Sequence, residues 1–355
     1  MNKKCLTMYL PQTRLDILLG SPNTVLIYSF IAGCSMAVNQ IQFQAGLSMR
    51  DFFARYGSEA QCEAALAAAR WPQGWRCARC SCCRSFRTQN RTGRPLWECF
   101  LCGYQSSVTV GTVFEHTKLP LSSWFLAIYL MTQSKNAVSA LELKRQLGVS
   151  YKTAWLLKHK LLETMRLREE PRRLDGRVEI DDAYLGGERA GHMHGGRGAL
   201  NKSAFVAAIQ TNDDGKPLFM RLTPIARFTK VAMKDWIENS LASTAHVVSD
   251  GTACFSQVLQ LGATHERHVT GSGRKAAQMP QFKWVNTMLG NLKTALSGTY
   301  HSFDHAKYAA RYLAEFSYRF NRRYDMAAMV PRLLRAAAVT KPLPFQLLRW
   351  SEACT

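Results

Sequence analysis

The sequence predicts a mixed α/β protein of 355 residues, in which a small cysteine-rich module and a helical region precede a larger domain. Two pairs of cysteines at metal-ligand spacing mark the small module, at residues 71–113. Two periodic helices joined by a short turn follow it. From residue 178 onward, strand-like apolar runs come first, and a helix, another strand and further helices follow. This order of elements is typical of a sheet covered by helices.

Charge and composition narrow the choice of partners. Lysine and arginine total 46 against 25 acidic residues, which gives a net charge of +21. A hydrophobic content of 47% argues against a disordered chain. So large a positive charge repels itself and favours a polyanionic partner, either nucleic acid or an anionic membrane. A solvated basic surface without a partner is the less favoured alternative.

The first 35 residues differ from the rest of the chain. A short apolar run at 25–34 follows three basic residues and resembles an export signal, although it is too short for a transmembrane helix. Export would separate the reduced cysteines from the reducing cell interior, and the positive charge from the DNA that it attracts. We therefore favour translation from Met36, with residues 1–35 as a non-native or disordered extension. Residues 36–70 then form a helical lead-in that is broken at Gly57.

The cysteine array predicts a structural zinc site in the module at 71–113. Two C-x2-C pairs separated by 18 residues present four thiolates, the ligand set of a closed tetrahedral zinc site. Eleven cysteines in all, an odd number, indicate a reducing compartment and no disulfide framework. The ligand identity stays open at the first pair, because Cys82 and Cys83 crowd it. Surrounding arginines suit a DNA-contacting ribbon, and a packing module with a basic surface is the alternative. The predicted ligands are Cys77, Cys80, Cys99 and Cys102.

The helical region at 114–167 has the layout of a helix-turn-helix. Gly148 suits the end of one helix and Ser150 suits the N-cap of the next. In DNA readers of this kind the second helix enters the major groove. A helical hairpin that does not touch DNA is the alternative, and residues 168–177 look like a linker to the next domain. The predicted DNA contacts on the second helix are Tyr151, Lys152, Thr153 and Lys158.

Two aspartates, Asp181 and Asp250, close predicted strands and form a candidate catalytic pair. Two carboxylates held close together repel each other unless a cation lies between them, and Mg²⁺ prefers oxygen ligands and phosphates. Asn286 can add an amide oxygen, and Lys293, nearly two turns later on the same helix face, can hold a phosphate oxygen. Asp182 is an alternative to Asp181, but strand alternation aims the two oppositely. Aspartates that only cap helices or turns are the competing interpretation.

Several stretches of the chain, from Met36 to Val339, resemble bacterial insertion-sequence DDE transposases with an N-terminal zinc ribbon. The resemblance implies a ribonuclease-H-like catalytic domain at 178–339, followed by a tail at 340–355. It also implies two-metal hydrolysis at the ends of the element and attack of the freed 3′-hydroxyl on target DNA. The matching stretches are CARC, CFLC, LGVSYKTAWLLKHKL, VEIDDAYLGG, VVSDG, WVNTMLGNLKTALSGTYHSF and YLAEFSYRFNRR.

Carried over residue by residue, the resemblance makes Asp181 and Asp250 the two magnesium-binding aspartates, with Mn²⁺ as the alternative ion. Asn286 stands where many relatives have a third acidic residue, and Lys293 matches the lysine that follows it. We read this Asp-Asp-Asn-Lys set as a subgroup feature. Because asparagine carries no charge, the means of holding a second ion stays open, and Glu179 or Glu315 are candidates. For Glu315 an ion pair is the favoured interpretation.

The expected partners are the terminal inverted repeats of the element and its target DNA, with a homo-oligomer in the working complex and no membrane. A cytoplasmic, nucleoid-associated protein is expected. Arg197 lies in a Gly- and Arg-rich loop expected to contact DNA, and His301 in GTYH either touches the scissile phosphate or packs. The alternatives are a catalytically inactive zinc-ribbon DNA-binding protein derived from a transposase, and a nuclease without joining activity.

Overall fold

The structure is a computed structural model. It describes residues 41, 43–91, 93–186, 202–269, 279–300 and 303–350. The predicted extension at 1–35, Arg197 and His301 lie outside the described residues. Residues 44–355 form one compact unit, and the domain boundaries expected within it remain predictions. Within the described ranges, no helix has the length and apolar character needed to span a bilayer.

The helical lead-in consists of α1 (Met49–Tyr56) and α2 (Glu59–Arg70), and the expected break at Gly57 separates them. Each helix begins at a serine whose hydroxyl accepts a hydrogen bond from a backbone N–H of the first turn. At the start of α2, the side chain of Gln61 also binds back to the N-cap backbone and completes a capping box.

The cysteine-rich module is a small antiparallel sheet. It contains β1 (Ser85–Gln89), β2 (Pro95–Cys99) and β3 (Gln105–Ser106), in the order β1-β2-β3. Trp97 of β2 is buried. Its ring packs edge-to-face with that of Trp71, and the ring centres lie 5.0 Å apart. Trp97 and the buried cysteines belong to the same hydrophobic cluster as residues of the helical region, so the ribbon shares its core with those helices.

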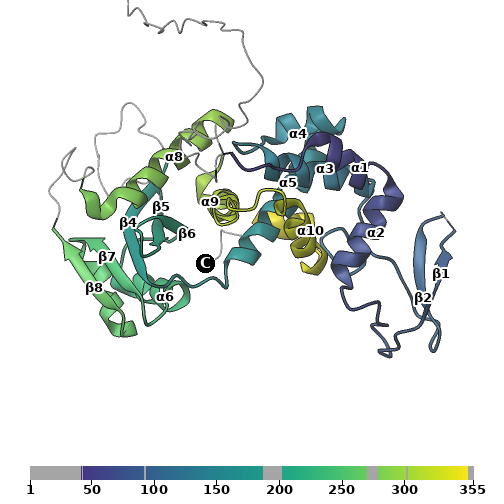
Figure 1. Cartoon of the computed structure of the whole chain (residues 1–355), viewed down its shortest axis with the longest axis horizontal. Coiled ribbons are helices and arrows are strands. Elements are labelled where there is room, and N and C mark those ends of the chain that lie inside the picture. Colours follow the sequence, from purple (N-terminus) through teal and green to yellow (C-terminus); the bar gives the residue numbers. More distant parts are fainter. Residues whose placement is uncertain are drawn as a thin grey trace, which may run out of the picture. The chain divides into compact units, whose positions relative to one another are not determined.

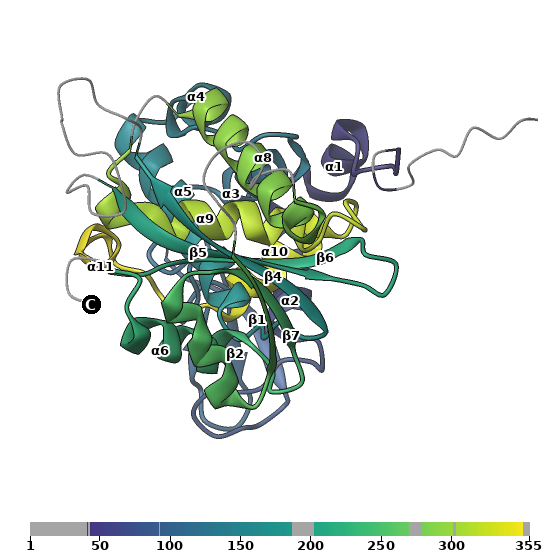
Figure 2. The same cartoon turned by 90° about the vertical axis from the view of Figure 1, so that its left-hand side faces the viewer.

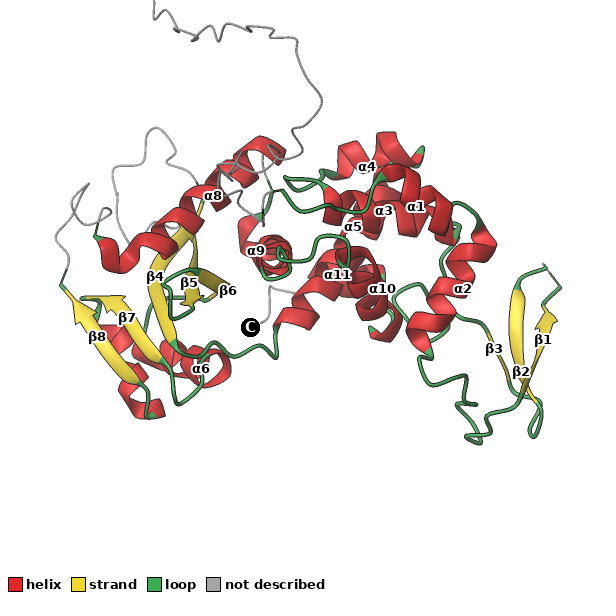
Figure 3. Cartoon of the chain, viewed as in Figure 1, coloured by secondary structure: helices red, strands yellow, loops and turns green. Residues whose placement is uncertain are grey.

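The helix-turn-helix layout is confirmed in its local geometry. Helix α4 (Ala140–Leu147) ends at Gly148, whose φ of 64° is the left-handed conformation that glycine adopts without strain. Ser150 caps α5 (Tyr151–Glu169) by accepting a hydrogen bond from the backbone of Thr153. Helix α5 continues into the predicted linker. The largely buried α3 (Leu121–Gln133) precedes this pair, and Figure 3 shows the helices of the region in red.

A five-stranded mixed sheet forms the core of the larger domain, with strand order β6-β5-β4-β7-β8. The central strand β4 pairs antiparallel with β5 and parallel with β7. Strand β6 adds antiparallel to β5, and β8 adds parallel to β7. The strands are β4 (Arg177–Leu185), β5 (Ser203–Thr211), β6 (Pro217–Pro224), β7 (His246–Asp250) and β8 (Thr264–His268).

Helices cover both faces of this sheet (Figure 2). Side chains alternate along each strand. Ile180 and Val206 therefore pack on one face, against α6 (Lys230–Ser240) and the 3-10 helix η1 (Ala253–Leu261). Ala207, one residue further along β5, faces the other side. The elements on that side are the 3-10 turn η2 (Pro280–Phe282), α8 (Lys283–Thr299) and α9 (His305–Phe320).

Helix α8 runs past Gly298 and ends at Thr299. After α9 the chain continues into α10 (Met329–Val339), which contacts α2, α3 and α5, and into the short α11 (Phe345–Trp350). Figure 1 shows α10 in yellow beside the teal α5. The tail expected at 340–355 thus contains a helical turn that packs on α5.

One asparagine seals the outer edge of β6. The amide oxygen of Asn321 accepts a hydrogen bond from Met220 N at 2.7 Å, and its amide nitrogen donates to Met220 O at 2.9 Å. Arg322, the next residue, pairs with Glu169 of α5 at 2.5 Å. The segment after α9 therefore joins the edge strand to the helical region by buried polar contacts.

We predict that Asn321→Ala destabilises the fold by about 2 to 4 kcal/mol, because it leaves a buried backbone N–H and C=O unsatisfied. The urea midpoint, followed by circular dichroism, measures the change. Asn239→Ala, on the exposed face of α6, is the matched control and should stay within about 0.5 kcal/mol of the parent. Equal midpoints for the two variants would contradict the prediction.

Candidate catalytic site and zinc cluster

Four cysteine sulfurs converge in the ribbon. The Sγ atoms of Cys77, Cys80, Cys99 and Cys102 all lie within 4.8 Å of one another. The closest sulfurs belong to different C-x2-C pairs, with Cys77 and Cys102 at 3.6 Å and Cys80 and Cys99 at 3.4 Å. The sequence left the ligands of the first pair open. Among the described residues the converging set contains neither Cys82 nor Cys83.

The two cysteine turns suit thiolate ligands. Gly103 follows the second pair with a φ of 65°, and its N–H bonds to Cys99 O at 3.0 Å, which closes a tight turn. Burial raises the pKa of the Cys99 thiol, but hydrogen bonds from the backbone of Cys102 and Leu101, together with those from the Cys80 and Cys102 thiols, lower that pKa to about 6. Four sulfur donors with this geometry fit a structural zinc ion.

Three carboxylates meet where strand β7 ends. Oxygen atoms of Asp181, Asp182 and Asp250 lie within 4.8 Å of one another. The parallel pairing of β4 with β7 runs as far as Ile180 and Ser249, so Asp181 and Asp250 are the next residues in register. The predicted convergence of the two aspartates is therefore confirmed. The prediction that Asp181 closes its strand is wrong, since β4 continues for four residues beyond it.

Asp182 joins this acidic cluster although strand alternation aims it away from Asp181. Alternation sets the direction of each Cα–Cβ bond, and the carboxylate at the end of a short side chain can still reach a neighbour across an open strand edge. Beyond Ile180, strand β7 no longer accompanies β4, so the short side chain can turn around the open strand edge towards Asp250. Sequence reasoning set this residue aside, and its signal was the doubled aspartate at a strand end.

Local hydrogen bonds orient the carboxylates. Asp250 accepts from the backbone N of Thr252 at 2.9 Å and from its hydroxyl at 2.8 Å. Asp181 accepts from the backbone N of Asp182 at 2.9 Å. Three close carboxylates repel one another, and a divalent cation relieves that repulsion. Three hard oxygen donors fit Mg²⁺ or Mn²⁺.

Glu179 positions the helix that covers the cluster. It is 1% exposed, and its Oε2 accepts hydrogen bonds from Trp284 N at 2.8 Å and Val285 N at 2.9 Å, in the first turn of α8. Its other oxygen pairs with Arg177 at 2.7 Å. The hypothesis that Glu179 helps to hold a second ion is wrong, since both oxygens are occupied in capping and pairing.

Asn286 and Lys293 both lie on α8. Asn286 is half-buried in the first turns after the Glu179 cap. Lys293 lines a pocket of about 520 Å³ together with Asp182. Tyr184 and Lys202 line the same pocket, and two lysines beside an aspartate give it both cationic and anionic groups. The pocket thus brings Lys293 together with a member of the acidic cluster.

His268 lies beside the cluster on the same face of the sheet. It is the register partner of Asp250, so the two side chains point the same way. Glu266 binds His268 at 2.6 Å and His246 at 3.0 Å. These two hydrogen bonds lower the pKa of Glu266. The strand pairing thus places the last histidine of the segment 265–268 next to the candidate site.

The predicted DNA contacts of α5 divide into two groups. Tyr151 is 49% exposed and Lys152 is exposed, while Thr153 is half-buried at the cap. Lys158 is 1% exposed, and its ammonium donates to the carbonyl of Val138. The prediction that Lys158 contacts DNA is therefore wrong, because neighbouring elements enclose that face of the helix.

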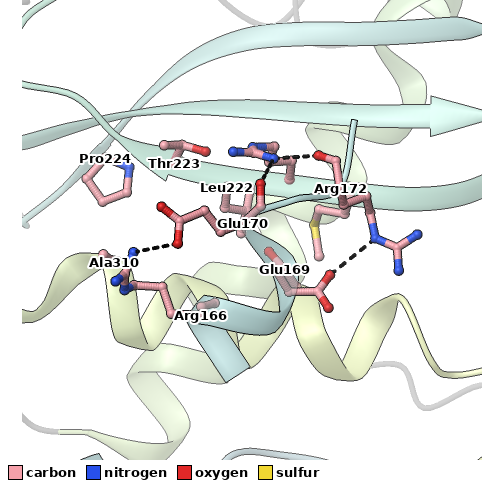
Figure 4. A pocket seen from close by; sticks show the side chains of 12 residues that line it. Arg166, Glu169, Glu170, Arg172, Leu222, Thr223, Pro224 and Ala310 are labelled. Atoms are coloured by element: carbon pink, nitrogen blue, oxygen red, sulfur yellow. Dashed lines mark hydrogen bonds and ion pairs between the residues drawn. The ribbon is translucent and has the colours of Figure 1, made fainter. Parts of the chain in front are cut away.

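A second hollow lies between the end of α5, β6 and α9 (Figure 4). Its volume is about 110 Å³. Its charged groups pair with one another, since Arg172 lies 3.5 Å from Glu169 and Arg166 lies 3.6 Å from Glu170. Both pairs are local to the end of α5, and Arg221 of β6 joins this end to the sheet by donating to the carbonyls of Glu170 and Arg172. These contacts give the hollow a structural interpretation.

Comparisons with known proteins agree with this arrangement. A family described as ISXO2-like transposase domain matches residues 173–321, which contain the acidic cluster and α8. A family described as transposase zinc-ribbon domain matches residues 57–105, which contain the four cysteines.

A curated relative from Halobacterium salinarum, an uncharacterised protein in transposable element ISH50, is 33% identical over 129 residues. The match covers 36% of this chain and 42% of the relative, so less than half of either protein is compared. The two matched families and this relative agree with the resemblance that the motifs carry. The resemblance to insertion-sequence DDE transposases with an N-terminal zinc ribbon is therefore confirmed.

Proposed function

We propose that this protein cleaves DNA strands at the ends of its insertion sequence and joins them to target DNA. The observation that carries the proposal is the cluster of Asp181, Asp182 and Asp250 at the end of parallel strand β7. Divalent ions bound there would polarise the phosphodiester and favour deprotonation of the attacking water or 3′-hydroxyl. The chain's own part is to hold three carboxylates in one orientation before DNA arrives.

We further propose that this domain has a ribonuclease-H-like fold. The support is a five-stranded mixed sheet whose central strand and its parallel neighbour carry the two aspartates, with helices on both faces. In that arrangement the acids share one edge of the sheet, and α8 lies over them.

Asp182 compensates for the neutral Asn286. Relatives with a third acidic residue balance two divalent ions with three carboxylates, and Asp182 restores that number at this site. The amide oxygen of Asn286 then serves as a neutral donor. Lys293, which shares a pocket with Asp182, holds a phosphate oxygen of the bound strand.

DNA-end recognition is assigned to the ribbon and to the start of α5. Exposed Tyr151 and Lys152 lie at the start of the second helix of the helix-turn-helix, where base and phosphate contacts are expected. On the ribbon, Arg84 lies 4.1 Å from the centre of the exposed Phe100 ring. A cationic and aromatic surface of this kind suits a nucleic acid. Because the two DNA ends of the element must be held together, the working complex contains more than one copy of the chain.

We predict that Asp181→Asn, Asp182→Asn and Asp250→Asn each lower Mg²⁺-dependent end cleavage by more than about a hundredfold, since each removes a charged ligand. Cleavage and strand transfer are measured on duplexes taken from the DNA flanking the gene. Asp213→Asn, in the exposed β5–β6 turn, is the control and should cleave like the parent. Full activity of Asp182→Asn would remove it from the site. A parent that binds these duplexes and never cuts would support the inactive DNA-binding alternative.

We predict that the purified protein contains one equivalent of zinc and that Cys99→Ser loses it, because three thiolates and a hydroxyl hold zinc poorly. Metal analysis after gel filtration measures the content. Cys83→Ser, which changes an exposed cysteine outside the converging set, should keep the full equivalent. Zinc loss from Cys83→Ser would show that the ligand set is different.

We predict that Lys152→Ala weakens duplex binding similarly for all sequences and reduces the slope of log affinity against log salt by about 1, as expected for one lost phosphate contact. Fluorescence anisotropy over a salt series measures both quantities. Lys234→Ala, on the exposed face of α6, is the control and should leave the slope unchanged. An unchanged slope for Lys152→Ala would place that lysine outside the DNA interface.

A further inference from the structure

Tyr300 connects three helices through its hydroxyl group. It follows α8 directly as the C-cap residue. Lys158 of α5 donates to the tyrosine oxygen at 2.5 Å, and the tyrosine donates to Glu315 Oε2 of α9 at 3.0 Å. Lys158 and Glu315 are almost completely buried, and their charged atoms lie 3.9 Å apart. The hydroxyl therefore lies between a buried ammonium and a buried carboxylate.

The same groups hold the segment that leads into the helix-turn-helix, residues 134–138. The ammonium of Lys158 donates to Val138 O at 2.6 Å, and the hydroxyl of Thr299, at the end of α8, donates to Ala137 O at 3.3 Å. Arg319 of α9 donates to the carbonyls of Ser134 and Lys135. The start of α4 and the end of α8 are thus anchored to one buried polar cluster.

Buried charges of this kind are expensive and geometrically demanding. Burial lowers the pKa of Lys158 to about 8, and the nearby Glu315 opposes that effect. An apolar core would hold helices together at lower desolvation cost, whereas a hydrogen-bonded ion pair tolerates only one relative placement. The Lys158 ammonium also lies 4.3 Å from the centre of the Tyr300 ring, so ring and hydroxyl are both fixed.

We infer that Tyr300 is a positioning residue that couples the helix-turn-helix, α4 and α5, to the placement of the catalytic helix α8. The inference rests on the proposed function for the roles of these helices. Lys293 lies seven residues before Tyr300, which is about 10 Å along a helix. A shift in how Tyr300 docks is therefore passed to Lys293 through a rigid element. DNA bound to α4 and α5 steadies residues 134–138, and through them the end of α8.

Tyr300→Phe tests this coupling, because it keeps the ring and removes only the hydroxyl. At saturating duplex from the flanking DNA, we expect the maximal cleavage rate to fall about tenfold to a hundredfold, as for a small displacement of a substrate-holding group. The duplex concentration that gives half the maximal rate should change less than about twofold, since the exposed DNA contacts are intact. Tyr318→Phe is the matched control, because Tyr318 is completely buried and its hydroxyl has no hydrogen-bond partner among the described residues.

Hydrogen exchange supplies a readout that does not depend on activity. In the parent protein, duplex binding without divalent metal should slow amide exchange in 134–138 and in the second half of α8. In Tyr300→Phe the duplex should bind equally well and slow exchange in α4 and α5 without slowing it in α8. Glu315→Gln, which keeps a hydrogen-bond acceptor and loses the charge, should show a smaller loss of both coupling and rate.

Two results would overturn the inference. One is cleavage by Tyr300→Phe at the parental rate, and the other is unchanged duplex-induced protection of α8 in Tyr300→Phe or, should that variant not fold, in Glu315→Gln. A parent that never cuts would overturn the proposed function instead, and the exchange experiment would still decide the coupling.

Discussion

A single buried carboxylate holds the candidate site together. Glu179 lies on β4 two residues before Asp181, and both hydrogen bonds that it accepts from α8 come from the first turn of that helix. Because residues two apart on a strand share a face, the strand that presents Asp181 also fixes the helix above it. Asn286 and Lys293 can therefore approach the acidic cluster only in the orientation that Glu179 sets. Tyr300 fixes the opposite end of α8, so the helix is pinned at both termini by polar contacts.

The net charge of the protein and the charge of its acidic cluster have opposite signs. A chain with a net charge of +21 gathers three carboxylates at one point. The overall charge attracts DNA at long range. The local acidic cluster would repel the same phosphates unless cations neutralise it. Lys293 and Lys202 line the pocket beside Asp182, so positive charge lies directly next to the acidic cluster.

The sequence was informative where a short local rule decides the structure, and less so where neighbours decide it. Gly148 and Ser150 were predicted as caps because capping depends on the adjacent turn alone. Asp181 and Asp250 were predicted to form a pair because each was expected to close a strand, and they converge although β4 continues beyond Asp181. Lys158 was misplaced, since helical periodicity gives the face of a residue and not the elements that cover it. Asp182 was set aside because alternation points its Cα–Cβ bond away from Asp181, whereas the pairing of β4 with β7 ends at Ile180 and leaves that strand edge open. The capping role of Glu179 joins residues more than a hundred positions apart and has no local signal.

The contact between Asn321 and Met220 has a consequence for assembly. An open sheet can recruit a strand from another molecule through the unpaired N–H and C=O groups along its margin. Here the asparagine amide already occupies both backbone groups of Met220, in the way an incoming chain would. Growth of the sheet by strand addition is thereby blocked at this point, which protects the edge strand from pairing with a second molecule.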